Sequence, residues 1–196
     1  MSEIRRLAVF CGSNPGARPD YVEGARALGR LLCERGIGIV YGGSSVGVMA
    51  ALAESVLDEL GEIIGVIPKM LVEREVAHRT LTDLRVVGSM HERKALIAEL
   101  SDGFVALPGG IGTLEEFFEI WTWAQLGVHQ KPCGLLNIAG YFDPLLAFLD
   151  RAVEEKFVRD VHRSMVIVES SPQALLARFE GYVPPKVVKW INVGTI

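Results

Sequence analysis

The feature that most constrains the fold of this chain is its alternation of short apolar runs with helix-like patterns. The runs at residues 7–11, 37–41 and 63–67 are apolar throughout, and each is followed at once by glycine or proline. Continuous apolar runs of this length are typical of strands buried on both faces, as in parallel sheets covered by helices. The sequence therefore predicts an α/β fold, a doubly wound parallel sheet in a three-layer α/β/α arrangement. The remaining predicted strands are a weak one at residues 85–87 and those at residues 104–107, 133–136 and 165–168.

Helical periodicity fills most of the intervals between these strands. The expected helices cover approximately residues 20–35, 46–60, 89–100, 113–126, 144–155 and 172–179. Asp20 and Glu23 have the spacing of a capping box, and Gly36 is a typical helix terminator. Residues 68–84 have no clean period and predict a long connection, which in compact domains is usually functional. We find no repeat or linker, so residues 1–196 are expected to form a single domain.

Composition excludes several classes of function. The net charge of −4 argues against a nucleic-acid partner, which would require a basic face. The apolar runs are too short to cross a bilayer, and the first residues do not resemble a signal peptide. The cysteines include no CxxC pair and are expected to be reduced thiols, and the histidines lack metal-ligand spacing. We therefore expect a cytoplasmic protein with no membrane contact, no metal and no cofactor.

Glycine-rich segments follow three of the predicted strands, at residues 11–14, 41–45 and 107–113. In an open parallel sheet, loops at the carboxyl ends of the strands form the ligand crevice. Glycines there allow backbone N–H groups to approach a ligand, and a following helix start favours an anion such as phosphate. The spacing does not fit G-x-G-x-x-G or a P-loop, so neither a dinucleotide nor a nucleoside triphosphate is indicated. A plain tight turn remains the alternative for each loop, more so for Gly42 and Gly43 than for residues 109–112.

Arg93 is the most informative charge in the sequence. Ser89 and Glu92 signal a helix start, and Arg93 then shares a helical stripe with apolar residues at positions 96, 97 and 100. A guanidinium on a buried face is unfavourable unless it is paired or holds an anion. We therefore expect a functional role for Arg93, with a structural ion pair as the alternative. Lys94 lies one step around the helix, where local evidence predicts a solvated side chain.

Glu116 has two interpretations that local reasoning leaves open. Thr113 and Glu116 have capping-box spacing, which would give the carboxylate a purely structural role. A carboxylate directly above a phosphate-type loop is equally well placed to act on a sugar. Glu115 beside it is consistent with a surface residue that complements the helix dipole.

Taken together, these segments resemble the LOG (LONELY GUY) family along nearly the whole chain. The matching stretches are VFCGSNPG at residues 9–16, YGGSSVGVM at 41–49, GVIPKML at 65–71, MHERK at 90–94, PGGIGTLEE at 108–116 and WTWAQLGVHQKPCGLLN at 121–137. The resemblance implies a Rossmann-like fold and hydrolysis of a cytokinin riboside 5′-monophosphate, or of AMP, to free base and ribose 5-phosphate. It also implies a homodimer with its active site near the interface.

Carried over by position, the resemblance makes Arg93 and Glu116 the catalytic pair. The positions it implies for substrate binding are Gly42, Gly43, Glu75, Met90, Lys94, Gly109, Gly110, Ile111, Gly112, Thr113, Leu114, Glu115 and Thr122. One departure is Ser44, where the family usually has a third glycine, and its side chain is expected to narrow the loop and alter substrate preference.

Two other functions compete with this hypothesis. Relatives often carry the label lysine decarboxylase, but no lysine here has the setting that a pyridoxal phosphate enzyme requires. A non-catalytic carrier of a phosphorylated cofactor such as molybdopterin would use the same glycine loops. It would not need Arg93 and Glu116 as a pair.

Overall fold

The computed structural model describes residues 4–72, 77–78, 81 and 83–186. Within them, parallel strands form one sheet in the order β4-β3-β2-β1-β5-β6-β7. The strands are β1 (Arg6–Phe10), β2 (Gly38–Tyr41), β3 (Ile63–Pro68), β4 (Asp83–Val87), β5 (Gly103–Ala106), β6 (Cys133–Leu136) and β7 (Val166–Glu169). The predicted doubly wound parallel sheet is confirmed, and every predicted strand is present within two residues of its expected bounds.

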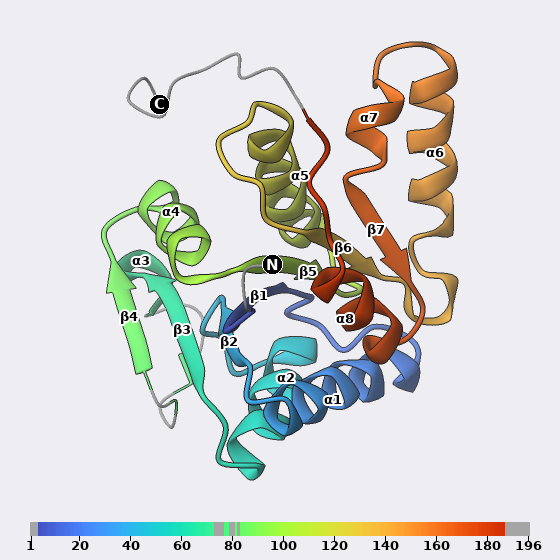
Figure 1. Cartoon of the computed structure of the whole chain (residues 1–196). Coiled ribbons are helices and arrows are strands. Elements are labelled where there is room, and N and C mark those ends of the chain that lie inside the picture. The colour runs from blue at the N-terminus through green and yellow to red at the C-terminus, as the bar shows by residue number, and fades with distance from the viewer. Residues whose placement is uncertain (1–3, 73–76, 79–80, 82, 187–196) are drawn as a thin grey trace.

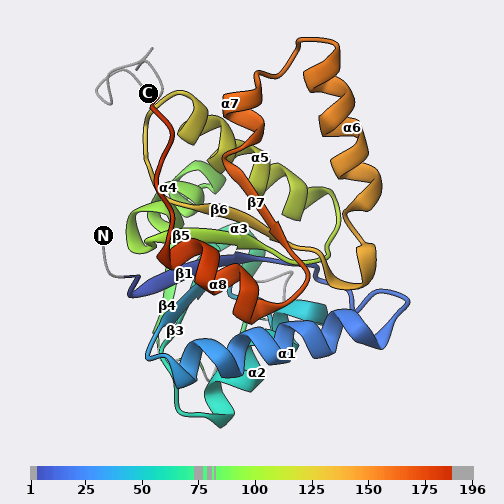
Figure 2. The ribbon, with the colours of Figure 1, turned by 45° about the vertical axis from the view of Figure 1, so that its right-hand side comes forward.

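Helices cover both faces of this sheet (Figures 1 and 2). They are α1 (Pro19–Glu34), α2 (Gly47–Asp58), α3 (Lys69–Val72), α4 (Met90–Leu100), α5 (Ile111–Gln125), the short 3₁₀ helix η1 (Ile138–Gly140), α6 (Asp143–Glu154), α7 (Asp160–Arg163) and α8 (Pro172–Glu180). Helices α1, α2 and α8 pack on one face, while α4, α5 and α6 contribute to the core on the other. The three-layer arrangement is therefore confirmed.

Strand β1 supplies both layers of the core because successive strand residues point to opposite faces. Leu7 and Val9 belong to the apolar cluster beneath α1 and α2, whereas Ala8 and Phe10 belong to the cluster beneath α4 and α5. All four are almost fully buried. This two-sided burial is why the strand reads as a continuous apolar run rather than as an alternating one.

The topological switch lies between β1 and β5, which are hydrogen-bonded neighbours in the sheet. The chain leaves β1 toward α1 on one face and leaves β5 toward α5 on the opposite face. Because these two connections diverge, a crevice opens at the carboxyl ends of the two strands, and this is where open α/β sheets bind their ligands. The fold thus brings together the glycine loops that follow β1 and β5.

Local signals at the start of the first helix were misleading. Helix α1 begins at Pro19, and its N-cap Arg18 is extended with no side-chain capping bond, so the predicted capping box of Asp20 and Glu23 is wrong. Proline at the first helical position supplies a preset φ and lacks the N–H that a cap would satisfy. Gly36 does end the helix, with φ +66°. Helices η1, α3 and α7 were not predicted, because each is a single turn or less and carries little periodicity.

His129 is a partly buried side chain that is held as a neutral imidazole. Its Nε2 donates to the carbonyl of Ile120 at 2.9 Å, and its Nδ1 accepts from the backbone N–H of Lys131 at 3.1 Å. Since a carbonyl can only accept, these two bonds fix the tautomer. Burial lowers the pKa of His129 to about 4, and the charge of Lys131 also lowers it, against the opposing effect of the Ile120 hydrogen bond.

We expect His129 to make stability fall as pH is lowered from about 6.5, the ordinary histidine pKa, toward 4. In that window the unfolded chain binds a proton that the folded chain excludes, so the stabilisation present at neutral pH is lost, by about 2 kcal/mol at pH 5. Urea unfolding at pH 7.5 and pH 5 measures this loss. His129→Gln, which keeps one donor and one acceptor but does not titrate, should remove this part of the pH dependence. If the stability of His129→Gln falls between pH 7.5 and pH 5 by as much as that of the wild type, His129 is not the group responsible.

Candidate active site

The start of helix α5 forms an anion cradle at the switch point. The helix begins at Ile111 with Gly110 as its N-cap, two residues before the predicted start at Thr113. The backbone N–H groups of Ile111, Gly112 and Thr113 therefore belong to the first turn and have no partner within the helix. Together with the positive end of the helix dipole they suit a phosphate group.

This helix start also rules out one of the two interpretations of Glu116, the capping box. Thr113 is the third residue of the helix rather than its cap, and the N-cap Gly110 has no side chain with which to bond. The predicted capping box of Thr113 and Glu116 is therefore wrong. The box was read from a helix expected to start at residue 113, whereas the helix starts at Ile111.

Gly109 is required by the close approach of the two loops that leave β1 and β5. A Cβ on Gly109 would collide with Thr113 Oγ1 and would lie 2.8 Å from the backbone nitrogen of Gly12. The Gly12 N–H in turn donates to the carbonyl of Pro108 at 3.2 Å. The start of α5 therefore packs directly against the loop that follows β1, and no residue larger than glycine fits at position 109.

Arg93 reaches the cradle from helix α4. Ser89 caps this helix by accepting from the Glu92 N–H at 3.1 Å, as the sequence predicts, and Arg93 follows on its buried face with a side chain that is 9 % exposed. Arg93 Nη2 lies 3.4 Å from the carbonyl oxygen of Gly42. Its Nε is buried without a hydrogen-bond partner in the described part of the chain. A buried donor without a partner is costly, which marks this guanidinium as one that a bound polar group would satisfy.

Glu116 faces Arg93 across a cavity of about 240 Å³. Its Oε1 lies 3.6 Å from Arg93 Nη2, which is longer than a hydrogen bond, and its side chain is 13 % exposed. The cavity is lined by Val9, Phe10, Cys11, Gly12, Ser13, Gly42, Met49, Arg93, Gly110, Ile111, Gly112, Thr113 and Glu116. A carboxylate, a guanidinium and a helix N-terminus therefore converge on one small space.

Lys94 does not lie where local reasoning predicted. Its side chain is 10 % exposed rather than solvated, and its Nζ lies 2.7 Å from Glu115 Oε1 and 2.8 Å from Glu119 Oε2. Burial pulls the pKa of Lys94 down, but the hydrogen bonds that Lys94 donates to the Glu115 and Glu119 carboxylates, together with their charges, outweigh this effect and raise that pKa. The three residues join α4 to α5 on the side away from the cavity, and Lys94 and Glu115 are not among the residues that line it.

The loop after β2 contributes through its first two glycines. Gly43 has φ +77°, which favours glycine, and a Cβ on Gly42 would displace Arg93 Nη2 from its place. Ser44 was expected to narrow this loop, but its side chain is fully buried and does not line the cavity. That expectation is wrong because the chain turns Ser44 inward, where it bridges to Ala77.

The other residues predicted to bind substrate are distributed around the cavity rather than all within it. Met90 is partly exposed at the start of α4, with its Sδ 3.9 Å from Arg93 Nη1. Ile111 is exposed at the cradle, while Leu114 packs against the core. Thr122 lies on the exposed side of α5, where its hydroxyl donates to the Phe118 carbonyl at 2.7 Å. Glu75 lies outside the described residues.

The structure adds wall residues that the sequence analysis did not single out. Cys11 and Ser13 belong to the first glycine loop, whose position was predicted, whereas no sequence signal pointed to Met49 on α2. Burial raises the pKa of the Cys11 thiol, and the charge of Glu116 raises it further, so this thiol stays protonated. It is therefore not a nucleophile of the thiolate kind.

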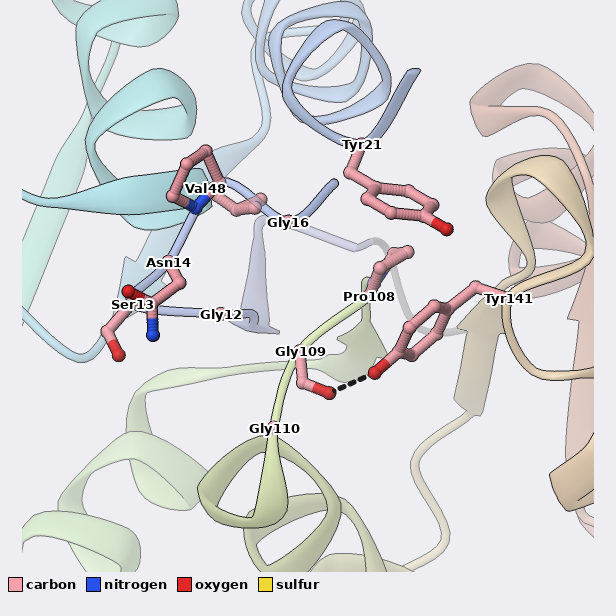
Figure 3. A pocket seen from close by; sticks show the side chains of 11 residues that line it. Gly12, Ser13, Asn14, Gly16, Tyr21, Val48, Pro108, Gly109, Gly110 and Tyr141 are labelled. Carbon is pink, nitrogen blue, oxygen red and sulfur yellow. Dashed lines mark hydrogen bonds between the residues drawn. The ribbon is translucent and has the colours of Figure 1, made fainter. Parts of the chain in front are cut away.

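A second cavity of about 250 Å³ adjoins the first and shares Gly12, Ser13 and Gly110 with it. Figure 3 shows Tyr21 and Tyr141 on one side of it and the 12–14 loop on the other. The Tyr141 hydroxyl donates to the Gly109 carbonyl at 2.6 Å. This cavity contains no charged side chain among its lining residues.

The described residues contain neither a cluster of metal ligands nor a helix fit to cross a membrane. No group of three or more histidine, cysteine, aspartate or glutamate side chains has the arrangement of a metal site there. No helix in that part of the chain combines the length and the apolar character that crossing a bilayer requires.

Comparison with known proteins identifies the family. The family model described as "Possible lysine decarboxylase" matches residues 49–179. The cytokinin riboside 5′-monophosphate phosphoribohydrolase LOG of Oryza sativa subsp. japonica is 48 % identical over 93 % of this chain and 76 % of its own length. The Arabidopsis thaliana phosphoribohydrolase LOG1 is 46 % identical over 93 % of this chain and 86 % of its own length. The chain belongs to the LOG family.

Solved structures extend this LOG-family fold to more distant proteins. The molybdenum cofactor binding protein from Rippkaea orientalis matches with a TM-score of 0.69 and 23 % identity, over 92 % of this chain and 98 % of that one. The molybdenum cofactor carrier protein of Chlamydomonas reinhardtii matches with a TM-score of 0.67 and 20 % identity, over 91 % and 98 % of the two chains. At such identities the likeness is one of fold alone.

Lys94, the buried lysine on α4 of this LOG-family chain, does not support the decarboxylase label of the family model. A Schiff-base lysine must lose its proton to act as a nucleophile, and a lowered pKa favours that loss. Lys94 is instead paired with two carboxylates that raise its pKa.

We expect Gly109→Ala to weaken phosphate binding at the cradle by more than about tenfold, because the added methyl group must displace Thr113 or the Gly12 loop. Gly112→Ala is the comparison, since a Cβ there meets no atom within 4 Å and leaves the backbone N–H in place. Titration calorimetry with inorganic phosphate, alongside thermal melting of each variant, measures both effects. Equal losses in the two variants would contradict the steric argument.

Proposed function

We propose that this chain hydrolyses the N-glycosidic bond of a nucleoside 5′-monophosphate to give free base and ribose 5-phosphate. The substrate class we propose is the cytokinin riboside 5′-monophosphates, with AMP as a further substrate. Relatives that carry this activity in their names share close to half of their residues with the chain over nearly its whole length. The observation that carries the proposal is the pairing of Arg93 and Glu116 across a cavity floored by a helix N-terminus.

Glu116 is the group suited to the sugar. Cleavage of an N-glycosidic bond passes through a transition state in which the ribose ring carries positive charge, as in glycoside hydrolysis generally. A carboxylate beside that ring stabilises the charge and orients the attacking water. The water adds to the anomeric carbon as the bond to the base breaks, and the base leaves with a proton. The small cavity keeps the carboxylate close to the reacting carbon.

The cradle and Arg93 are suited to the charged end of the substrate and to the leaving group. The N–H groups of Ile111, Gly112 and Thr113 face the 5′-phosphate in this proposal, and the Thr113 hydroxyl lies beside them. Arg93, with its buried Nε, then binds either phosphate or the departing base. Neither role requires a metal ion, since the helix N-terminus and the guanidinium supply the positive charge.

A cofactor carrier was the alternative hypothesis. The likeness to molybdenum cofactor carriers is one of fold, at 20–23 % identity. A carrier needs the glycine loops but has no use for a carboxylate facing a guanidinium above them. The Arg93–Glu116 pair therefore favours catalysis.

Arg93→Ala and Glu116→Gln should each lower turnover by about 10²–10³-fold, because each removes one charge-assisted contact from the transition state. The assay is incubation of the purified chain with AMP and with isopentenyladenosine 5′-monophosphate, followed by chromatography for free base. Glu34→Gln, at the exposed end of α1 and remote from the cavity, is the control that should retain wild-type turnover.

Two results would count against the enzyme. Full activity in either active-site variant would remove Arg93 and Glu116 from the mechanism. Tight nucleotide binding by the wild-type chain without any release of base would favour a carrier.

We also propose a cytoplasmic homodimer. All three cysteines are free thiols, which fits a reducing compartment.

The argument for a dimer is the place of Thr122. The family resemblance assigns it to the nucleotide site, yet it lies on the exposed side of α5 and does not line the cavity of its own chain. If a second copy of the chain packs against α5, Thr122 can be exposed in its own chain and still lie at the nucleotide site of that copy.

If Thr122 completes the site of a second copy, mixing two inactive variants should restore activity. Thr122→Val and Glu116→Gln are each expected to be impaired alone, and a mixed dimer of the two contains one site with both native residues. Sedimentation analysis establishes the dimer, and the base-release assay on the refolded mixture measures the rescue. A monomer in solution, or no rescue, would refute this arrangement.

A further inference from the structure

The hydroxyl of Tyr141 holds the peptide that leads into the anion cradle. We propose that Tyr141 is a positioning residue, which fixes the Gly109–Gly110 peptide so that the Gly110 N–H is directed toward the substrate phosphate. The inference depends on the proposed function for the identity of the ligand, a 5′-phosphate. Neither the family resemblance nor the lining of the Arg93–Glu116 cavity assigns Tyr141 a role.

The geometry of one hydrogen bond carries the argument. Tyr141 Oη donates to the Gly109 carbonyl oxygen at 2.6 Å from the side of the second cavity (Figure 3). A trans peptide is planar, and its N–H points opposite to its C=O. The Gly110 N–H is therefore directed away from Tyr141. Gly110 lines both cavities; Tyr141 lines only the second one, whereas Ile111, Gly112 and Thr113 line the cavity of Arg93 and Glu116.

The Gly109–Gly110 peptide needs such an anchor because it joins two glycines. Glycine has access to more backbone conformations than any other residue. A Cβ on Gly110 would meet no atom within 4 Å, so packing at that residue does not restrict the peptide. Gly110 is also the N-cap, and it has no side chain with which to organise the helix start. The hydrogen bond from Tyr141 supplies the restraint.

Tyr141 is 38 % exposed, and its ring makes two aromatic contacts. It packs edge-on against Tyr21, with centroids 5.4 Å apart, and against Phe142, with centroids 5.1 Å apart. Phe142 is 1 % exposed and belongs to the core beneath α5. The position of the hydroxyl is thereby tied to the body of the fold.

The backbone before Tyr141 is constrained as well. Ala139 and Gly140 are both left-handed, with φ +53° and +72°, and alanine adopts that region only where its surroundings require it. The Asn137 side chain helps to hold the turn in this conformation. It donates to Asp143 at 2.7 Å and accepts from the Phe142 N–H at 2.7 Å. A strained and multiply bonded turn thus presents Tyr141 to the glycine loop.

Tyr141→Phe tests the proposal because it removes the hydroxyl and keeps the ring. Loss of this one hydrogen bond should weaken binding of ribose 5-phosphate and of inorganic phosphate by about 2- to 10-fold in titration calorimetry. KM for AMP should rise by a similar factor, with kcat nearly unchanged, because the phosphate is held equally in ground state and transition state.

Tyr21→Phe is the matched control. Tyr21 lines the same cavity and touches the same ring, but its hydroxyl has no hydrogen bond to any described residue. Phosphate affinity in this variant should equal that of the wild type. Unchanged affinity in Tyr141→Phe, an equal loss in both variants, or a fall in kcat without a change in affinity would each overturn the proposal.

Failure of the proposed function gives a different result. If the wild-type chain binds neither ribose 5-phosphate nor inorganic phosphate, the cradle itself is not a phosphate site. If the wild type binds both and Tyr141→Phe does too with equal affinity, the cradle stands and only the role of Tyr141 is rejected.

Discussion

The contact between the loops that leave β1 and β5 is the constraint on which the site depends. The Gly12 N–H donates to the Pro108 carbonyl, and the Leu107 N–H donates to the Phe10 carbonyl at 2.9 Å. With Gly109 packed against the Gly12 backbone, no side chain separates the two loops. The chain then diverges to opposite faces of the sheet, and the space left between the diverging helices is the cavity. Glu116 on α5 is therefore fixed relative to a floor made of main-chain atoms, which side-chain motion does not alter.

Ion pairs between helices α4 and α5 are the second feature on which the site depends. Arg93 and Lys94 are consecutive on α4, and Glu116 and Glu115 are consecutive on α5, so each pair of neighbours points in different directions around its helix. Arg93 and Glu116 face the cavity at 3.6 Å, whereas Lys94 bonds to Glu115 and Glu119 outside it. The ion pairs of Lys94 connect the two helices outside the cavity. Inside the cavity, the gap between Arg93 and Glu116 is one that a substrate group can bridge. Burial of the charges is tolerated because each has an opposite charge nearby.

The likeness to cofactor carriers indicates how function is divided from fold. The sheet and its helices are shared with proteins at 20–23 % identity, whose titles name molybdenum cofactor binding or carrying. A helix N-terminus made of backbone groups does not depend on side-chain identity, so a fold can keep it through large changes of sequence while its function changes. The chemistry depends instead on what projects above the cradle, which in this LOG-family chain is a carboxylate opposite a guanidinium.

The sequence by itself determined the parallel sheet, because strands buried on both faces must be apolar throughout, and it located the glycine loops and the cap of α4 at Ser89. These are local properties that a window of a few residues contains. Only the tertiary structure decided that Lys94 is buried against Glu119, that Ser44 turns inward, and that Glu116 faces Arg93 instead of capping its helix. It also brought Tyr141 onto Gly109, 32 residues away along the chain. Such contacts follow from the order of strands in the sheet and from the packing of helices across it, and local periodicity contains neither.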